Sequence, residues 1–336
     1  MRTTTETLAG GIVRVIVESP EGDRYAVMST GASLTEWTTR EGHGIVAAYA
    51  DPGEYRKPGM YLGTTVGLTA GRIRDGRFTL DGKPYATSRT PAHYLHCGKE
   101  GISLRDFELV SATSGSKAAT VVFRLTQAPN LFDATVTVTV TYVFDRNGVD
   151  IVLEATTDRP ILCNLTNHSY FNLAGDFDRP ADDHLLTIDA SRVVLVDGEM
   201  LGTDIVDVAG TVFDFRKERR ILPSVLDPTL QRQAARGIDH YFLTGVRTKP
   251  ILTMRSERTG LILDVTTDYP GTTVYTTNYP NEVPIQTGRT LTRHAAVAIE
   301  PQFQSNGIND PRFPDFILRP EERYRHEIGF HLRRSR

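Results

Sequence analysis

Cysteines and long apolar segments are scarce in this sequence of 336 residues. The two cysteines, Cys97 and Cys163, are too few for a disulfide framework and lack the spacing of a zinc site. One bridge and two free thiols are both open interpretations, and a reducing cytosol favours free thiols. No apolar core of a signal peptide follows Met1, and no apolar run approaches the roughly 20 residues of a membrane helix. We therefore expect a cytoplasmic protein with no membrane partner.

An excess of charge of either sign is also missing. The chain has 38 basic and 41 acidic residues, so no bulk positive field is available to hold nucleic acid or anionic lipid. Its content of 39% hydrophobic and 24% charged residues is that of a globular protein, which excludes the collagenous and disordered classes. We expect no nucleic-acid partner.

Short alternating runs dominate the sequence. The clearest is Asp133–Phe144, in which valines and aromatic residues fall on one face and threonines on the other. This period of two in β-branched residues is typical of a half-buried strand. A turn at Asp145–Gly148 and a second run at Val149–Thr157 follow. Because an Asn-Gly pair adopts positive φ without strain, the two runs predict a hairpin.

Further runs show the same strand pattern. They are Gly11–Glu18, Arg24–Ser29, Ala119–Thr126, Leu185–Ala190, Ser191–Val196, Ile251–Ser256, Leu261–Thr267, Thr272–Asn278, Ala295–Glu300 and Tyr324–Leu332. Helical periodicity is scarce, and its best candidate, Leu222–Arg236, contains Pro223 and Pro228. Many strands without alternating helices predict an all-β fold, a large antiparallel β-sandwich with few short helices. Since no repeat or low-complexity linker interrupts the chain, we expect residues 1–336 to form a single domain.

Polar side chains are concentrated in a few segments of this strand-like sequence. In Tyr94–Gly101, His96 precedes a glycine-containing loop that lets a ligand approach the backbone. His93 and His96 are spaced as metal ligands on a helix would be. The local sequence is not helical and no third ligand has suitable spacing, so we expect no metal.

Three other segments offer groups for binding or proton transfer. Asn164–Gly175 packs hydrogen-bonding groups between aromatic side chains, which suits recognition of a polyhydroxylated ligand. For this segment alone, a buried and satisfied His168 in a polar turn is the commoner interpretation. Glu300 ends an apolar run, where desolvation would raise its pKa toward the range useful for proton transfer. A strand-end glutamate more often points into solvent, and Asp239 could equally bind ligand hydroxyls or only shape a turn.

Six motifs occur together in the order of one known family. They are Leu95-His96-x-Gly98, the stretch Asn167–Gly175 with the sequence NHSYFNLAG, Gly210-Thr211-x-Phe213-Asp214-Phe215-Arg216, Gly237-x-Asp239-His240-x-Phe242, Tyr275-Thr276-x-Asn278 and Ile299-Glu300-x-Gln302. The set resembles the aldose 1-epimerase (galactose mutarotase) family from about Leu62 to the C-terminus, and less clearly before it. One motif would be weak evidence, whereas six in order are specific.

The resemblance implies a galactose mutarotase-like supersandwich. It also implies an isomerase that interconverts the α and β anomers of a free sugar without cofactor or metal, as a monomer or homodimer. Opening the sugar ring requires a proton to leave the C1 hydroxyl and another to reach the ring oxygen. The resemblance assigns the general base to Glu300 and the general acid to His168. The residues expected to bind the sugar are His96, Arg72, Asp239, Gly71, Tyr170 and Thr273.

Several positions depart from the family pattern. Leu68 replaces an arginine, and Gly71 replaces an asparagine that can touch sugar hydroxyls. Thr273 replaces a glutamine, Cys97 a glycine, and Ser305–Gly307 a Pro-Asp-Ala sequence. Each lost ligand hydrogen bond costs about 0.5–1.5 kcal/mol, so these changes could redirect the sugar preference. Two alternatives therefore stay open: a paralogue that acts on another hemiacetal or biosynthetic intermediate, and a non-catalytic sugar-binding module, which would not need the acid–base pair.

Overall fold

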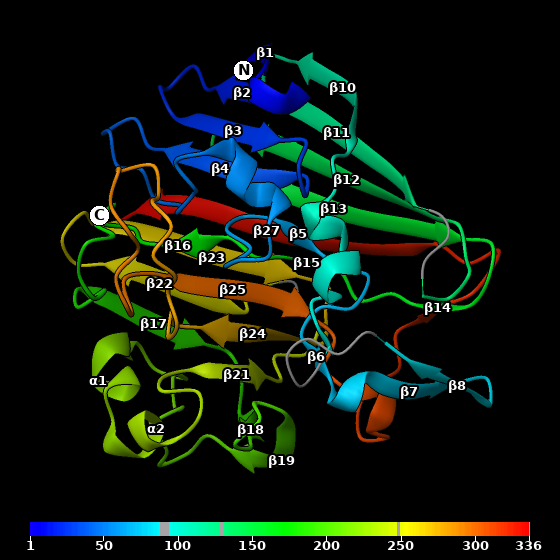
Figure 1. The fold of residues 1–336 in the computed structure, drawn as a ribbon. Coiled ribbons are helices and arrows are strands. Elements are labelled where there is room, and N and C mark those ends of the chain that lie inside the picture. Colours follow the sequence, from blue (N-terminus) through cyan, green and yellow to red (C-terminus); the bar gives the residue numbers. More distant parts are fainter. Residues whose placement is uncertain (88–93, 128–130, 247–248, 336) are drawn as a thin grey trace.

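The computed structural model describes residues 1–87, 94–127, 131–246 and 249–335, and its strands pair antiparallel in three main sheets (Figure 1). The nine-stranded sheet has the order β10 (Glu108–Ser114), β11 (Ala118–Gln127), β12 (Val136–Asp145), β13 (Gly148–Thr157), β27 (Tyr324–Arg334), β23 (Leu261–Thr267), β22 (Leu252–Ser256), β17 (His184–Ile188) and β20 (Arg219–Arg220). The six-stranded sheet has the order β16 (Tyr170–Phe171), β25 (Val297–Gln302), β24 (Gly271–Tyr275), β21 (Asp239–Phe242), β18 (Arg192–Val196) and β19 (Gly202–Asp207).

Smaller elements complete the fold. The four-stranded sheet contains β1 (Arg2–Thr7), β2 (Val13–Glu18), β3 (Arg24–Met28) and β4 (Ser33–Thr38). Two-stranded ladders join β5 (Thr65–Val66) to β15 (Thr166–Asn167), β6 (Arg72–Ile73) to β9 (Tyr94–Leu95), β7 (Arg77–Leu80) to β8 (Lys83–Ala86), and β14 (Ile161–Leu162) to β26 (Ile317–Leu318). The 3₁₀ turns are η1 (Ala9–Gly11), η2 (Pro52–Arg56), η3 (Arg74–Gly76), η4 (Gly98–Glu100), η5 (Ile102–Leu104) and η6 (Gly307–Asn309). Among the described residues, α-helix is limited to α1 (Ile221–Val225) and α2 (Pro228–Arg232).

The predicted antiparallel β-sandwich is confirmed by the packing of aromatic side chains between sheets. Tyr25 on β3 lies 4.9 Å, centroid to centroid, from Phe144 on β12 of the nine-stranded sheet. Phe171 on β16 lies 4.8 Å from Phe330 on β27. The four-stranded and six-stranded sheets therefore both pack on the nine-stranded sheet, and the core fills the space between them.

The predicted hairpin is confirmed, with one difference in its turn. Strands β12 and β13 pair from Val136 with Thr157 to Asp145 with Gly148, so Arg146 and Asn147 form the connection. Gly148 is already part of β13, with a φ of 153°. A Cβ at this position would lie 2.1 Å from the carbonyl oxygen of Phe330. The glycine is needed for the close approach of β27, rather than for the turn itself.

The other predicted strand runs each overlap a strand, although the run Thr272–Asn278 is a strand only as far as Tyr275. Leu222–Arg236, the best helix candidate of the sequence, is helical only in part. The segment forms α1 and α2, which are separated at Leu226–Asp227. Pro228 occupies the first turn of α2, where its missing N–H costs nothing, and the Asp227 side chain accepts a hydrogen bond from the Thr229 N–H. Proline thus starts a new helix here and ends the previous one.

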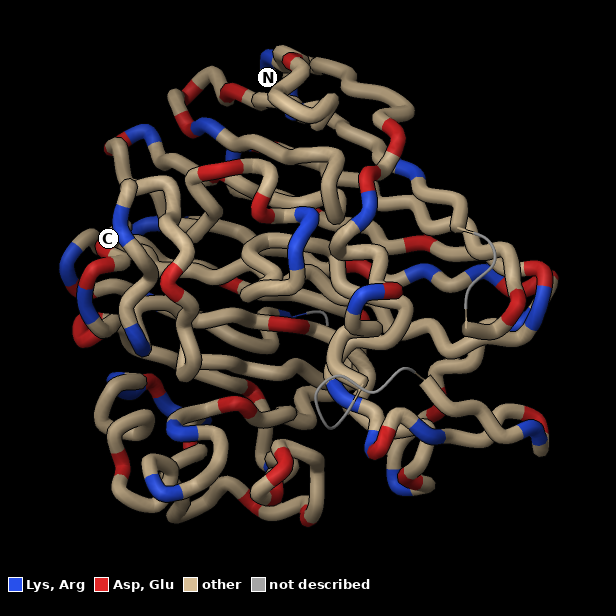
Figure 2. The backbone as a smooth tube through the Cα atoms, viewed as in Figure 1, with Lys and Arg blue, Asp and Glu red and all other residues tan. Residues whose placement is uncertain are grey.

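Charge is spread over the chain, and basic and acidic residues are interspersed in the view of Figure 2. Neither α1 nor α2 approaches the length needed to cross a membrane, and the described residues contain no helix that does.

Candidate active site

The floor of the candidate site is one face of the six-stranded sheet. Side chains alternate along a strand, so Glu300 and Gln302 on β25 face the same way. On the neighbouring strand β24, Thr273 is paired directly with Glu300. Tyr275 lies two residues beyond Thr273 and is paired with Asp239 on β21. The register of three strands therefore places a base candidate, two hydroxyl groups and a second carboxyl group on one surface.

The opposite face of the same strands packs in the hydrophobic core and so holds this surface in place. Val297 and Ile299 on β25 and Val274 on β24 belong to the main hydrophobic core. Each of them is no more than 1% exposed. The alternation that directs these side chains into the core directs Glu300 and Thr273 to the other face.

Two loops supply the walls of the site. His168 lies between β15 and β16, and Tyr170 on β16 is paired with β25. His96 directly follows β9, which pairs with β6 so that Leu95 lies opposite Arg72. Residues from two distant segments, Gly71–Arg72 and His96, thus reach the same wall.

These elements enclose a cavity of about 210 Å³. It is lined by all eight residues that the sequence proposed for the site: Gly71, Arg72, His96, His168, Tyr170, Asp239, Thr273 and Glu300. Their proximity is a property of the structure, while the role of each residue is still a prediction. His93 falls outside the described residues.

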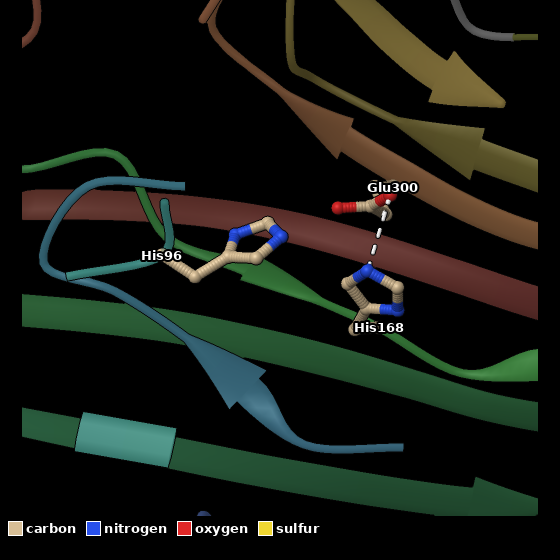
Figure 3. Close-up of side chains that lie close together, drawn as sticks. All are labelled: His96, His168 and Glu300. Atoms are coloured by element: carbon tan, nitrogen blue, oxygen red, sulfur yellow. Dashed lines mark ion pairs between the residues drawn. The ribbon is translucent and has the colours of Figure 1, made fainter. Parts of the chain in front are cut away.

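Glu300 and His168 form the closest acid–base pair of the cavity. The His168 Nε2 lies 3.4 Å from the Glu300 Oε1, and both imidazole rings of the site point toward this carboxyl group (Figure 3). Glu300 is 3% exposed and His168 is 5% exposed. The His168 ring stacks on Tyr170 at a centroid distance of 5.0 Å, which holds the imidazole in place.

Burial drives the pKa values of this pair in opposite directions. Desolvation raises the pKa of Glu300 well above its usual value, and the charge of Asp239 adds to this effect while Arg72 opposes it. Desolvation lowers the pKa of His168 to about 4. Between these two pKa values the pair holds one proton, and that proton resides on Glu300.

His96 has a defined tautomer. Its Nδ1 accepts a hydrogen bond from the Gly71 backbone N–H at 3.0 Å, so in the neutral ring the proton must be on Nε2. Burial lowers the pKa of His96 well below its usual value, and the charges of His168 and Arg72 add to this effect. Tyr61 packs edge-on against the ring at 4.8 Å between centroids. His96 is therefore a neutral hydrogen-bond donor at one wall of the cavity.

Arg72 and Asp239 form a second polar pair. The Arg72 Nη1 lies 3.8 Å from the Asp239 Oδ2, and both side chains are partly exposed to the cavity. Burial raises the pKa of Asp239, whereas the Arg72 charge acts to lower it. A guanidinium beside a carboxylate offers donors and acceptors together, as hydroxyl groups of a sugar require.

The site also contains the group of potential metal ligands found among the described residues. One ligand atom each from His96, His168 and Glu300 lies within 4.8 Å of the other two. Ligands bonded tetrahedrally to one zinc ion at about 2.0–2.2 Å would be only about 3.4 Å apart, so binding would require these side chains to move closer. The absence of a metal requirement stays a prediction.

The five departures from the family pattern divide into two groups. Gly71, Thr273 and Ser305 line the cavity. Leu68 and Cys97 line a separate small cavity. The Cys97 Sγ accepts a hydrogen bond from the Thr69 backbone N–H at 3.1 Å and does not line the cavity that contains Glu300. Both Cys97 and Cys163 are free and buried, so no disulfide joins them.

Sequence reasoning missed several residues that line the cavity. They are Gly59, Met60, Tyr61, Leu95, Tyr275, Tyr279, Gln302 and Ser305. Gln302 and Tyr275 could have been found, because each follows a predicted site residue by two positions on a strand and so shares its face. Ser305 was marked only by the departure at Ser305–Gly307, and Tyr61 carries no local signal, since a loop brings it to the cavity.

Comparisons with known proteins agree along nearly the whole chain. The family model described as aldose 1-epimerase matches residues 14–331. A galactose mutarotase of Sus scrofa is 32% identical over 319 residues, which cover 91% of this chain and 90% of that protein. An aldose 1-epimerase of Escherichia coli is 31% identical over 308 residues, covering 89% and 86% respectively. A crystal structure of an aldose epimerase homologue from C. elegans superposes with a TM-score of 0.84 at 28% identity and covers 100% of both chains.

Proposed function

Since the chain belongs to the aldose 1-epimerase family, we propose that its cavity binds the ring form of a free sugar and that Glu300 and His168 exchange protons with it. As a member of this family the protein is an isomerase that interconverts sugar anomers. One observation carries the residue assignment: a buried carboxyl group and a buried imidazole lie 3.4 Å apart at the wall of a cavity that also holds Arg72 and Asp239. A binding module would gain nothing from burying such a pair.

The reaction needs two proton transfers and no electron transfer to or from the sugar. The Glu300 carboxylate removes the proton of the C1 hydroxyl, and the His168 imidazolium delivers a proton to the ring oxygen as the bond between C1 and this oxygen breaks. Rotation about the C1–C2 bond of the open aldehyde then exposes its other face. When the ring closes, His168 takes back the proton and Glu300 returns one to the new C1 hydroxyl. Both residues finish in their starting states.

One proton transfer within the pair converts its form in the free protein into the form that the reaction requires. The free pair holds its proton on Glu300, because desolvation disfavours both charged forms. Transfer of this proton to His168 produces the carboxylate and imidazolium that the reaction requires. Sugar hydroxyl groups and the Arg72 charge favour this form, because they supply hydrogen bonds and an opposite charge to the carboxylate.

The remaining polar residues orient the sugar. His96 presents a neutral N–H, and the Arg72–Asp239 pair presents donors and acceptors to ring hydroxyls. Galactose is our first candidate substrate, because several relatives are named galactose mutarotase. The cytoplasmic location, the single domain and the absence of a nucleic-acid partner stay predictions of the sequence.

Replacement of Glu300 by glutamine tests the proposal. The amide keeps the shape of the side chain but cannot accept the C1 proton, so we expect catalysed mutarotation of galactose to fall about 10²- to 10⁴-fold in kcat. Polarimetry of freshly dissolved sugar measures this rate. The matched control is Glu108→Gln on the exposed strand β10, which should retain the wild-type rate. Wild-type activity in the folded Glu300→Gln variant would reject the assignment.

A further inference from the structure

Gly71 and Ser305 lie side by side at the wall of the cavity. Both residues line it. Gly71 has a φ of 74°, and a Cβ built on it would lie 1.6 Å from the Ser305 Oγ and 2.8 Å from the Ser305 Cβ. The serine side chain therefore fills the space that any side chain at position 71 would need.

The Ser305 hydroxyl is held in this place by the loop that carries it. Its Oγ accepts a hydrogen bond from the Arg72 backbone N–H at 3.4 Å. The next residue, Asn306, accepts one from the Arg74 N–H through its Oδ1 at 3.1 Å. In η6, the Asn309 side-chain amide donates to the Arg77 carbonyl at 2.8 Å. Because the hydroxyl oxygen is the acceptor in its contact with Arg72, its own proton is available to a ligand.

Two other neutral polar residues, Thr273 and Gln302, line the same cavity as Ser305. The Gln302 Nε2 donates to the Thr273 Oγ1 at 2.9 Å, so the Thr273 hydroxyl proton is also free to point elsewhere. Over the ranges that the structure covers, the buried Gln302 Oε1 has no hydrogen-bond partner. A buried acceptor without a partner is costly, and a ligand hydroxyl that donates to it removes that cost.

Ser305 and Thr273 approach Glu300 from different elements. Thr273 is paired with Glu300 across β24 and β25, whereas Ser305 follows β25 and lies against Gly71, whose N–H donates to His96. In the six-stranded sheet, β16 with Tyr170 flanks one side of β25, and β24 with Thr273 flanks the other. Because all of these residues line one cavity, a sugar that reacts at Glu300 and His168 also presents ring hydroxyls to Ser305.

We propose that Ser305, set against Gly71, is a specificity-determining residue that donates a hydrogen bond to one ring hydroxyl of the sugar. This inference rests on the proposed function, because it assumes that the sugar reacts between Glu300 and His168. Ser305 thus makes the contact with the sugar that a longer side chain at position 71 would otherwise make. The rigid attachment of this loop to residues 72–77 makes the contact selective for a hydroxyl at one place on the ring.

The first test compares Ser305→Ala with wild type on galactose and on its monodeoxy analogues, by NMR exchange between anomers. We expect the variant to lower kcat/KM for galactose about 2- to 13-fold, which corresponds to one neutral hydrogen bond. On the analogue that lacks the contacted hydroxyl, variant and wild type should be equal. The control Ser116→Ala, in the exposed turn between β10 and β11, should match wild type on every sugar.

The pattern across sugars separates this inference from the proposed function. An equal effect of Ser305→Ala on galactose and on all analogues, or no effect on any, would overturn the role of Ser305. The proposed function would stand in either case. It would fall only if Glu300→Gln kept wild-type activity on galactose.

The second test uses the shared space itself. Gly71→Asn should lose activity more than 10-fold, because its Cβ collides with Ser305, although asparagine tolerates the positive φ better than most residues. Adding Ser305→Gly removes both colliding atoms, so the double variant should recover activity and show a changed order of preference among aldoses. A double variant that is folded by circular dichroism and no more active than Gly71→Asn would show that the two positions are not interchangeable.

Discussion

The Glu300→Gln variant should have a larger free energy of unfolding than the wild type, and this difference should grow as pH rises. Burial raises the pKa of Glu300 well above the usual 4.5. Above pH 4.5 the carboxyl group is ionised in the unfolded chain, whereas the folded chain keeps its proton until the raised pKa is reached. The folded state binds more protons in this window, so its free energy of unfolding falls as pH rises. Glutamine does not ionise and removes this dependence.

The size of the effect follows from proton linkage. A difference of one bound proton changes the free energy of unfolding by about 1.4 kcal/mol per pH unit. His168 acts in the opposite direction, because its pKa of about 4 lies below the usual 6.5 and the folded state binds fewer protons between these values. In the wild type the two dependences offset each other from pH 4.5 to 6.5. Above pH 6.5 only the loss from Glu300 continues.

Urea unfolding at a series of pH values above 6.5 measures this difference. The single tryptophan, Trp37, is buried in the core and reports unfolding by its fluorescence. With a urea dependence of about 3 kcal/mol per molar, the gap between variant and wild-type midpoints should widen by about 0.5 M per pH unit. Glu108→Gln should follow the wild type. Parallel midpoint curves for wild type and Glu300→Gln would refute the buried, raised-pKa carboxyl group.

Three further outcomes are expected. The reaction needs one proton shared between Glu300 and His168. We therefore expect kcat to fall as pH decreases toward 4, where His168 gains a second proton for the pair, and to fall again at high pH, where Glu300 loses its proton. A kcat that does not change with pH would contradict this sharing. Prolonged treatment with EDTA should leave mutarotation unchanged, whereas a loss restored by Zn²⁺ would make the group containing His96 a metal site. A chromogenic thiol reagent should detect neither Cys97 nor Cys163 in the folded chain and both in urea, because both thiols are buried, and rapid reaction of the folded chain would contradict this burial.

The fold class could be predicted because its signal is local. The alternation of valine and threonine over Asp133–Phe144 indicates which residues face the core, and this does not depend on which strand pairs with it. The same reasoning indicated only a helix candidate over Leu222–Arg236, weakened by its prolines, and the structure divides it into α1 and α2 with Pro228 at the start of the second. This reasoning also assigned Gly148 to a turn, although its importance lies in contact with Phe330, a residue far away in the chain.

The sequence by itself determined the strand-forming runs, the residue types available for proton transfer and the position of Glu300 within an apolar run. Only the tertiary structure decided that His168 lies 3.4 Å from Glu300 and that Ser305 fills the space beside Gly71. The reason is physical: periodicity depends on neighbours along the chain, whereas a cavity depends on strand register and on loops that join distant segments. Burial within that cavity, rather than residue identity alone, separates the pKa values of the acid and the base.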